Sequence, residues 1–348
     1  QRDRIPSLPD QAEVWFRRSL ATLDRQSALR DLDQALRRDP SHVASLERKL
    51  CLLDASGDTA GALDCAKRLV DLNVGAVYWG RYRGDYLLRR GSFEEALEAF
   101  DHLAQLGSTD PTDYSRRGQI ERRLRRYDRA LADFSKSISM CKDDYAAAYI
   151  YSFRGTVHWI LGHPDAAVAD YRKSAELLPN PTYSEVRAAI ILREQGRERE
   201  AGEMLRGLLG WSGPDSSKTD AEWLHAIATC LAGDLMPREL VALVEPGDGR
   251  RLCEACYYAA EASLAAGEIG QAREWFQRCL ATNIQMDPDF LADPMSEFEL
   301  AEWRLKDPRF GSARAAGPAD SSHLDAAVAI DADPTAGAIG PLVANATP

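Results

Sequence analysis

Cys253 and Cys256 form a Cys-x-x-Cys motif, a spacing that serves zinc binding and thiol–disulfide chemistry in other proteins. A zinc site would need a second cysteine pair or a histidine at suitable spacing, and the sequence has neither. Cys256 stands where the helical pattern described below has a large apolar residue, and Cys279 stands where it has a small one. We therefore interpret these cysteines as buried structural residues, because free cysteine packs as a small hydrophobe.

The sequence contains none of the common catalytic motifs. It has no His-Glu-x-x-His pair for a metal, no Gly-x-Ser-x-Gly nucleophile turn and no glycine-rich phosphate loop. Asp143 and Asp144 are adjacent, but paired acids in a predicted loop are usually solvated. No set of reactive side chains converges, so we predict that the chain is not an enzyme and uses no cofactor or metal.

The densest positive charge lies in residues 122–129 (RRLRRYDR). One interpretation is a site for RNA, another polyanion or a phosphopeptide. The alternative is a helix end whose arginines favour the helix dipole and pair with nearby acids. The whole chain has 43 Lys and Arg against 54 Asp and Glu, a net charge of −11. That balance argues against nucleic acid, which requires clustered and uncompensated positive charge.

Composition indicates a chain that can bury a core over most of its length. It is 45% hydrophobic and 28% charged, and its apolar runs are too short for a transmembrane helix. The seven cysteines form no regular framework, which slightly favours a cytoplasmic, reducing compartment. An exported form stays open because the sequence begins at Gln1 and not at Met. The last residues, 311–348, have no aromatic side chain and no sustained period, so we expect a disordered tail.

Three series of small residues share one period of 34 residues, with two insertions of three. The alanine series is Ala28, Ala62, Ala96, Ala130, Ala167, Ala201 and Ala272. The glycine series is Gly57, Gly91, Gly162, Gly196, Gly233 and Gly267. The third series is Gly84, Gly118, Gly155, Ala189, Ala226 and Ala260. A fixed period of this length is the signature of a helical repeat array.

Each repeat is predicted to be a pair of helices. In residues 93–106 the apolar positions recur at spacings of three and four, as on one face of a helix. The glycine of the second series ends the first helix, where a left-handed cap carries no Cβ penalty. The small residues of the other two series mark the crossing of paired helices. A bulky residue follows four places after the alanine, as at Phe100, Phe134 and Tyr171, and fills the next groove.

On these residues the chain resembles a tetratricopeptide repeat protein, of the bacterial scaffold type. Residues 77–110 and 148–179 are the clearest copies, and the likeness covers about residues 9–286 in roughly eight units. The second unit departs from the pattern at Ala66 and the seventh at Arg238, which takes the small crossing position. The resemblance implies an all-α, right-handed superhelical solenoid. A leader (1–8) would precede the solenoid. A capping segment (287–310), with a helix over 296–306, would follow it, and the tail would come last.

The resemblance also implies that the first helix of each pair lines a concave groove. Its positions 2, 5, 9, 12 and 13 would point into that groove. The partner-binding residues predicted on this basis are Arg81, Asp85, Arg89, Ser115, Gln119, Arg122, Arg123, Tyr149, Trp159 and Tyr183. Arginines beside aromatic rings suit an acidic or C-terminal peptide, since the guanidinium fork matches carboxylates. The alternative is that the arginines are solvated and the aromatics only pack the solenoid.

Some members of the family clamp the terminal carboxylate of chaperone tails with lysine and asparagine. The corresponding positions here hold Arg81, Asp85, Arg116, Tyr149 and Phe153, which argues against that ligand. We therefore predict a scaffold that binds a partner protein or peptide in its groove. The alternative is a regulatory or localising module of a larger, exported or membrane-anchored protein whose catalytic part lies elsewhere. The identity of the partner and the oligomeric state are left open.

Overall fold

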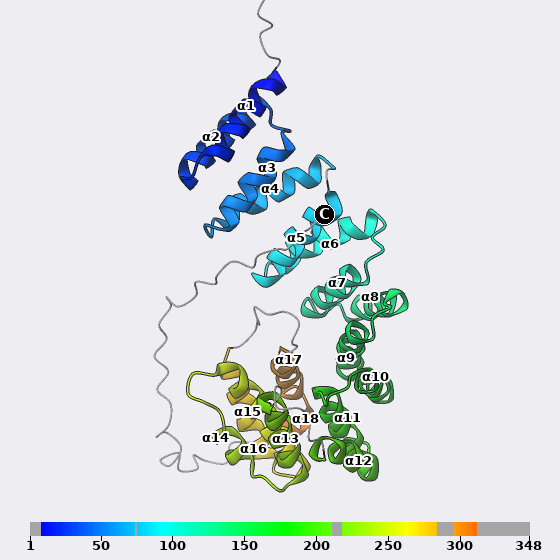
Figure 1. The fold of residues 1–348 in the computed structure, drawn as a ribbon. Helices are drawn as coiled ribbons and strands as arrows, with labels where there is room; N and C mark the ends of the chain where they lie inside the picture. Colours follow the sequence, from blue (N-terminus) through cyan, green and yellow to red (C-terminus); the bar gives the residue numbers. More distant parts are fainter. Residues whose placement is uncertain (1–7, 74, 211–217, 284–294, 312–348) are drawn as a thin grey trace, which may run out of the picture. The chain divides into compact units, whose positions relative to one another are not determined.

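The computed structural model describes residues 8–73, 75–210, 218–283 and 295–311, and all secondary structure in those ranges is helical (Figure 1). The predicted all-α repeat fold is confirmed. The expected leader and disordered tail lie outside the described residues, except for Leu8 and Gly311, which belong to helices. The described chain divides into two compact units, residues 8–109 and 110–311. The predicted domain limits remain predictions.

Unit 1 consists of three successive helical hairpins. Its helices are α1 (Leu8–Ala21), α2 (Arg25–Arg38), α3 (Val43–Asp54), α4 (Thr59–Asp71), α5 (Ala76–Arg89) and α6 (Phe93–Gln105). Asp24 and Asp58 cap the second helices α2 and α4 by accepting backbone N–H bonds with their carboxylates. Leu46, Cys65 and Trp79 belong to a shared core beneath α2 to α5. Ala66, where the repeat pattern departs, is fully buried there.

Unit 2 continues the hairpins and adds two terminal helices. The hairpin helices are α7 (Pro111–Arg123), α8 (Tyr127–Met140), α9 (Asp144–Ile160), α10 (Pro164–Leu177), α11 (Tyr183–Glu194), α12 (Glu198–Leu209), α13 (Lys218–Ala232), α14 (Pro237–Ala242), α15 (Gly249–Ala265) and α16 (Ile269–Ala281). The terminal ones are α17 (Met295–Arg304) and α18 (Pro308–Gly311). The helix α14 is a single short stretch that leaves Arg238 exposed, so this arginine does not fill the crossing position.

The small residues act as the periodic pattern predicts. All six glycines of the helix-ending series have positive φ, from 72° at Gly196 to 90° at Gly233. At the crossings there is no room for a larger residue: a Cβ on Gly84 would lie 2.6 Å from the ring of Phe100. A Cβ on Gly118 would lie 2.9 Å from the ring of Phe134. At these glycine crossings the bulky residue of the second helix therefore packs directly on the backbone of the first.

Candidate interaction surface

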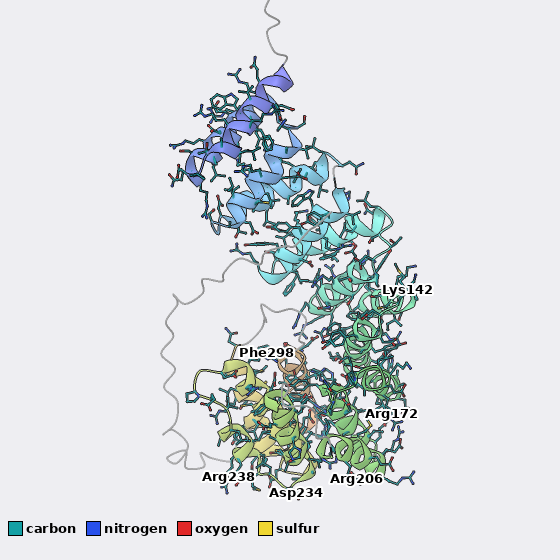
Figure 2. All side chains as sticks on the ribbon, viewed as in Figure 1. Lys142, Arg172, Arg206, Asp234, Arg238 and Phe298 are labelled. Carbon is teal, nitrogen blue, oxygen red and sulfur yellow. The ribbon has the colours of Figure 1, made fainter. Side chains whose placement is uncertain are left out.

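The first helices of unit 2 carry a helix of the same chain on one side. Figure 1 shows α17 between α15 and the stack that contains α9 and α11. Its face toward these helices consists of Glu297, Leu300, Ala301 and Arg304, which recur at spacings of three and four and are all buried. Phe298 of α17, labelled in Figure 2, packs half-buried against the same core. The predicted capping helix thus exists, and it also reaches α7, α9 and α11, far from the last repeat.

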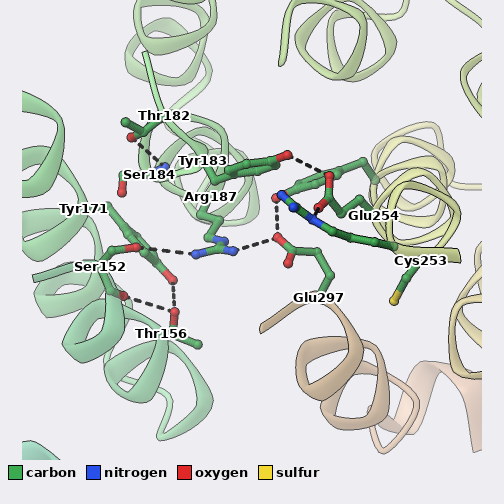
Figure 3. A network of polar contacts seen from close by, with 12 residues as sticks. Ser152, Thr156, Tyr171, Thr182, Tyr183, Ser184, Arg187, Cys253, Glu254 and Glu297 are labelled. Atoms are coloured by element: carbon green, nitrogen blue, oxygen red, sulfur yellow. Dashed lines mark hydrogen bonds and ion pairs between the residues drawn. The ribbon is translucent and has the colours of Figure 1, made fainter. Parts of the chain in front are cut away.

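The N-terminal end of α17 is held by Arg187 of α11 (Figure 3). Its Nη2 donates to Oε1 of Glu297 at 2.7 Å, and the two side chains are 2% and 1% exposed. The hydroxyl of Tyr258, on α15, donates to the same oxygen at 2.7 Å. The carboxylate of Glu297 therefore joins a first helix of a middle repeat to the first helix of the last one.

At the C-terminal end of α17 the charges are reversed: α17 supplies the arginine, and α15 and α11 supply the carboxylates. Arg304 donates from Nε and Nη2 to both carboxylate oxygens of Glu261, at 2.7 and 3.0 Å, and from Nη1 to Glu194 at 2.6 Å. Its guanidinium lies 4.9 Å from the centre of the Trp159 ring and 5.0 Å from that of Trp303. Such a two-point contact fixes the position of the guanidinium plane as well as neutralising its charge.

A second side of α17 carries acids that face the arginine-rich run. Glu299 lies 3.6 Å from Nε of Arg122, which is 2% exposed. Glu302 accepts from Arg125 at 2.5 Å, and this pair is about half exposed. Elsewhere in the run, Arg126 and Arg129 both lie within 4 Å of Glu121. The second interpretation of residues 122–129, arginines paired with nearby acids, is the one these contacts support.

A buried glutamate lies beside this interface, on α15. The Oε2 atom of Glu254 accepts from the hydroxyl of Tyr183 and from the indole of Trp223, both at 2.7 Å (Figure 3). Burial raises the pKa of Glu254, and the nearby carboxylate of Glu297 adds to that rise. Burial likewise raises the pKa of the Tyr183 hydroxyl, which stays a neutral donor at physiological pH. The hydroxyl of Tyr183 is therefore already engaged within the chain and does not donate to an outside ligand.

The predicted partner-binding residues of unit 2 are in three different situations. Arg122, Trp159 and Tyr183 are covered by the contacts above. Ser115 is buried and lies 3.5 Å from the half-buried amide of Gln119. Arg123 and Tyr149 are half-buried, and Tyr149 donates to the hydroxyl of Tyr145 at 3.0 Å. Burial raises the pKa of Tyr149 to about 12.

The remaining predicted residues belong to helix α5 of unit 1. Arg81 and Asp85 are half-buried, whereas the side chain of Arg89 lies outside the described part of the structure. Arg81 lines a surface hollow of about 470 Å³ together with Val77, Tyr78 and Leu106. Tyr78 is 63% exposed there. The hollow therefore offers apolar area next to a cation, a combination that suits a peptide side chain.

The Cys-x-x-Cys motif lies on α15, and Cys253 and Cys256 are buried, as predicted. The Sγ atoms of Cys253 and Cys279 are 3.2 Å apart, and burial raises the pKa of the Cys256 thiol to about 12. In the described ranges no group of three potential metal ligands comes together. Among the helices that the structure describes, none is long and apolar enough to cross a membrane.

The residues that matter most around α17 were not among those predicted. Arg187 occupies position 6 of its repeat and not one of the five groove positions, and Glu261 and Glu297 lie outside the predicted set. A signal was present in residues 297–304 (EFELAEWR). The face that the helical period assigns to the core has a glutamate at one end and an arginine at the other. Charges on a core-facing stripe require charged partners elsewhere in the chain.

Stacked helical hairpins with close glycine crossings and capped turns define the class: a helical-repeat protein. Within that class, the chain carries tetratricopeptide repeats. Two tetratricopeptide family models match it, over residues 48–111 and 148–181. These proteins act as protein-interaction scaffolds, and that general role is the one the repeats support.

Several solved structures are similar in fold. A structure of the MamA protein is 18% identical, with a TM-score of 0.45, over 51% of this chain and 94% of that one. YrrB, a TPR protein with an unusual peptide-binding site, is 16% identical, with a TM-score of 0.44, over 51% and 91%. A tetratricopeptide repeat protein from Parabacteroides merdae is 16% identical, with a TM-score of 0.42, over 83% and 99%. No curated protein matches the chain in sequence.

Proposed function

We propose that this chain is a scaffold that binds a partner protein or peptide on the surface of its first helices. The observation that carries the proposal is α17. In unit 2 the first helices hold a helix through buried arginine–carboxylate pairs and aromatic contacts, the chemistry by which such surfaces recognise peptides. A surface that binds one helix in this way has the shape and charge to bind another.

The predicted residues outside the α17 contacts supply the part of the surface that an incoming partner can reach first. In unit 1 these are Arg81, which lines the hollow with the exposed ring of Tyr78, and the half-buried Asp85. In unit 2 they are the half-buried Arg123 and Tyr149. An acidic segment is the matching ligand, because carboxylates pair with arginine and aromatic rings add contact area at a small entropy cost.

Affinity capture from the source cells tests the proposal. The native chain is compared with an Arg81→Ala, Arg123→Ala, Tyr149→Ala variant by mass spectrometry. The matched control is Arg37→Ala, Arg206→Ala, on the second helices α2 and α12, where both arginines are exposed. We expect one protein captured by the native and control chains and lost from the first variant. Equal capture by all three chains would place recognition elsewhere on the molecule.

A further inference from the structure

We propose that the surface of α7, α9, α11 and α15 is a docking site for a partner helix of defined pattern, and that α17 occupies it as a competitor within the chain. The pattern is Glu at one position, apolar residues three and four places later, and Arg seven places later. This inference rests on the proposed function and specifies the partner and the regulation of that surface. The partner is a helix of another protein that carries the same four residues.

The polar ends of the site carry the argument. If α17 served only to seal the core, apolar residues would do so at least as well, because a buried ion pair is seldom more stabilising than a hydrophobic pair of similar size. Instead Glu297 and Arg304 meet Arg187 and Glu261, and all four side chains are at most 3% exposed. The best-attested role of such buried charges is to fix register and orientation, which a recognition site requires and a plain seal does not.

The two ends also give the site a direction. Arg187 accepts only a helix whose glutamate lies at its N-terminal end, and Glu261 with Glu194 accepts an arginine at the C-terminal end. A helix bound in reverse would place a carboxylate against Glu261 and a guanidinium against Arg187. Like charges brought together without water oppose binding strongly, so the reversed helix is rejected. Between the ends, Leu300 and Ala301 are fully buried, so the site takes apolar side chains at these two positions.

Competition within the chain follows from the shared site. A partner can bind only the fraction of molecules whose site is empty, so its dissociation constant is raised by the reciprocal of that fraction. Two further pairs of α17, Glu299 with the buried Arg122 and Glu302 with the half-exposed Arg125, raise its occupancy but do not belong to the four-residue pattern. Charge reversal of these two glutamates should therefore release α17 and leave the recognition residues intact.

The test uses the full chain and a fluorescent peptide of residues 295–306 (MSEFELAEWRLK) as the probe. Binding is measured by anisotropy for the native chain, for Glu299→Lys, Glu302→Lys, and for a control with Glu203→Lys, Glu274→Lys at exposed positions of α12 and α16. Hydrogen exchange of the α17 amides reports its release. If the first variant does not fold, Trp303→Ala replaces it, because it removes the contact with the Trp159 ring, 5.9 Å away.

We expect the released variant to expose the α17 amides and to bind the peptide at least about tenfold more tightly than the native and control chains. A peptide carrying Glu297→Arg and Arg304→Glu has the same composition and should lose about tenfold or more of that affinity. The inference is wrong if the α17 amides become exposed and the peptide still does not bind. It is equally wrong if the native and the charge-swapped peptide bind alike. It is also wrong if the α17 amides stay protected from hydrogen exchange in both Glu299→Lys, Glu302→Lys and Trp303→Ala.

The outcome for the proposed function is separate. If the peptide binds the released variant but no cellular protein is captured by any chain, this site recognises helices and the scaffold proposal fails. If a cellular partner is captured equally by native and released chains while the peptide does not bind, the scaffold proposal stands and α17 is a fixed structural element.

Discussion

The buried pair between Arg187 and Glu297 allows a test whose magnitude follows from the structure. Arg187→Met alone, or Glu297→Leu alone, removes one member of this ion pair. The other member is then a charge at most 2% exposed that has lost its ion-pair contact, which should cost about 3–5 kcal/mol. The double variant removes both charges, and the Tyr258 hydroxyl then loses its acceptor, a cost of about 1–3 kcal/mol. We therefore expect the double variant to be more stable than either single one.

The control for this test lies on the same helix. The pair between Arg125 and Glu302 has a similar short contact, 2.5 Å, but is 50% and 40% exposed. Arg125→Met, Glu302→Leu should change stability by at most about 1 kcal/mol. All variants are compared by urea unfolding, followed by tryptophan fluorescence, since Trp159 and Trp303 lie in the interface. If the double variant lost the sum of the single losses, or the exposed pair cost as much as the buried one, the reasoning would be refuted.

Three further predictions concern the repeats and the buried network. Gly118→Ala places a Cβ 2.9 Å from the Phe134 ring and should cost about 1–3 kcal/mol, whereas Gly207→Ala, with open space around it, should gain up to about 1 kcal/mol in the same urea assay. Folding raises the pKa of Glu254 above its reference value of 4.5, so its contribution to stability is largest below pH 4.5 and is lost as the pH rises through the folded value. Glu254→Gln should therefore become progressively more stable relative to the native chain between pH 4.5 and 8, and a constant difference would contradict the raised pKa. Arg304→Lys keeps the charge but loses the two-point carboxylate contact, and a fall in Tm is expected; an unchanged Tm would show that charge alone suffices.

The hairpins could be predicted from the sequence because their determinants are local and repeated. A glycine at the end of each first helix and a small residue at each crossing are needed wherever two helices pack closely, so they recur with the repeat. The same reasoning identified Phe100, Phe134 and Tyr171 as the bulky partners. It also marked Arg238 as a departure, and α14 is indeed the shortest helix of the hairpins in the described chain.

The position of α17 could not be predicted in this way. Arg187 and Glu297 are 110 residues apart, and nothing periodic relates a terminal helix to a middle repeat. A repeat pattern specifies contacts between neighbours, whereas α17 contacts first helices of several repeats at once. The groove positions taken from the family resemblance do not tell whether another part of the chain covers them. Arg122, Trp159 and Tyr183 are covered in this way.

Stability and recognition are linked at this interface, which gives a last prediction. If Arg187→Met, Glu297→Leu is stable, the peptide of residues 295–306 meets a site that has lost its arginine and holds a better-matched apolar α17. If α17 binds its site more tightly in the variant, the peptide must displace it at a higher free-energy cost. The affinity of the variant for the peptide should therefore be lower than that of the native chain. In anisotropy titrations, tighter binding by this variant would show that the peptide binds elsewhere. The buried charges would then stabilise the fold without selecting a ligand.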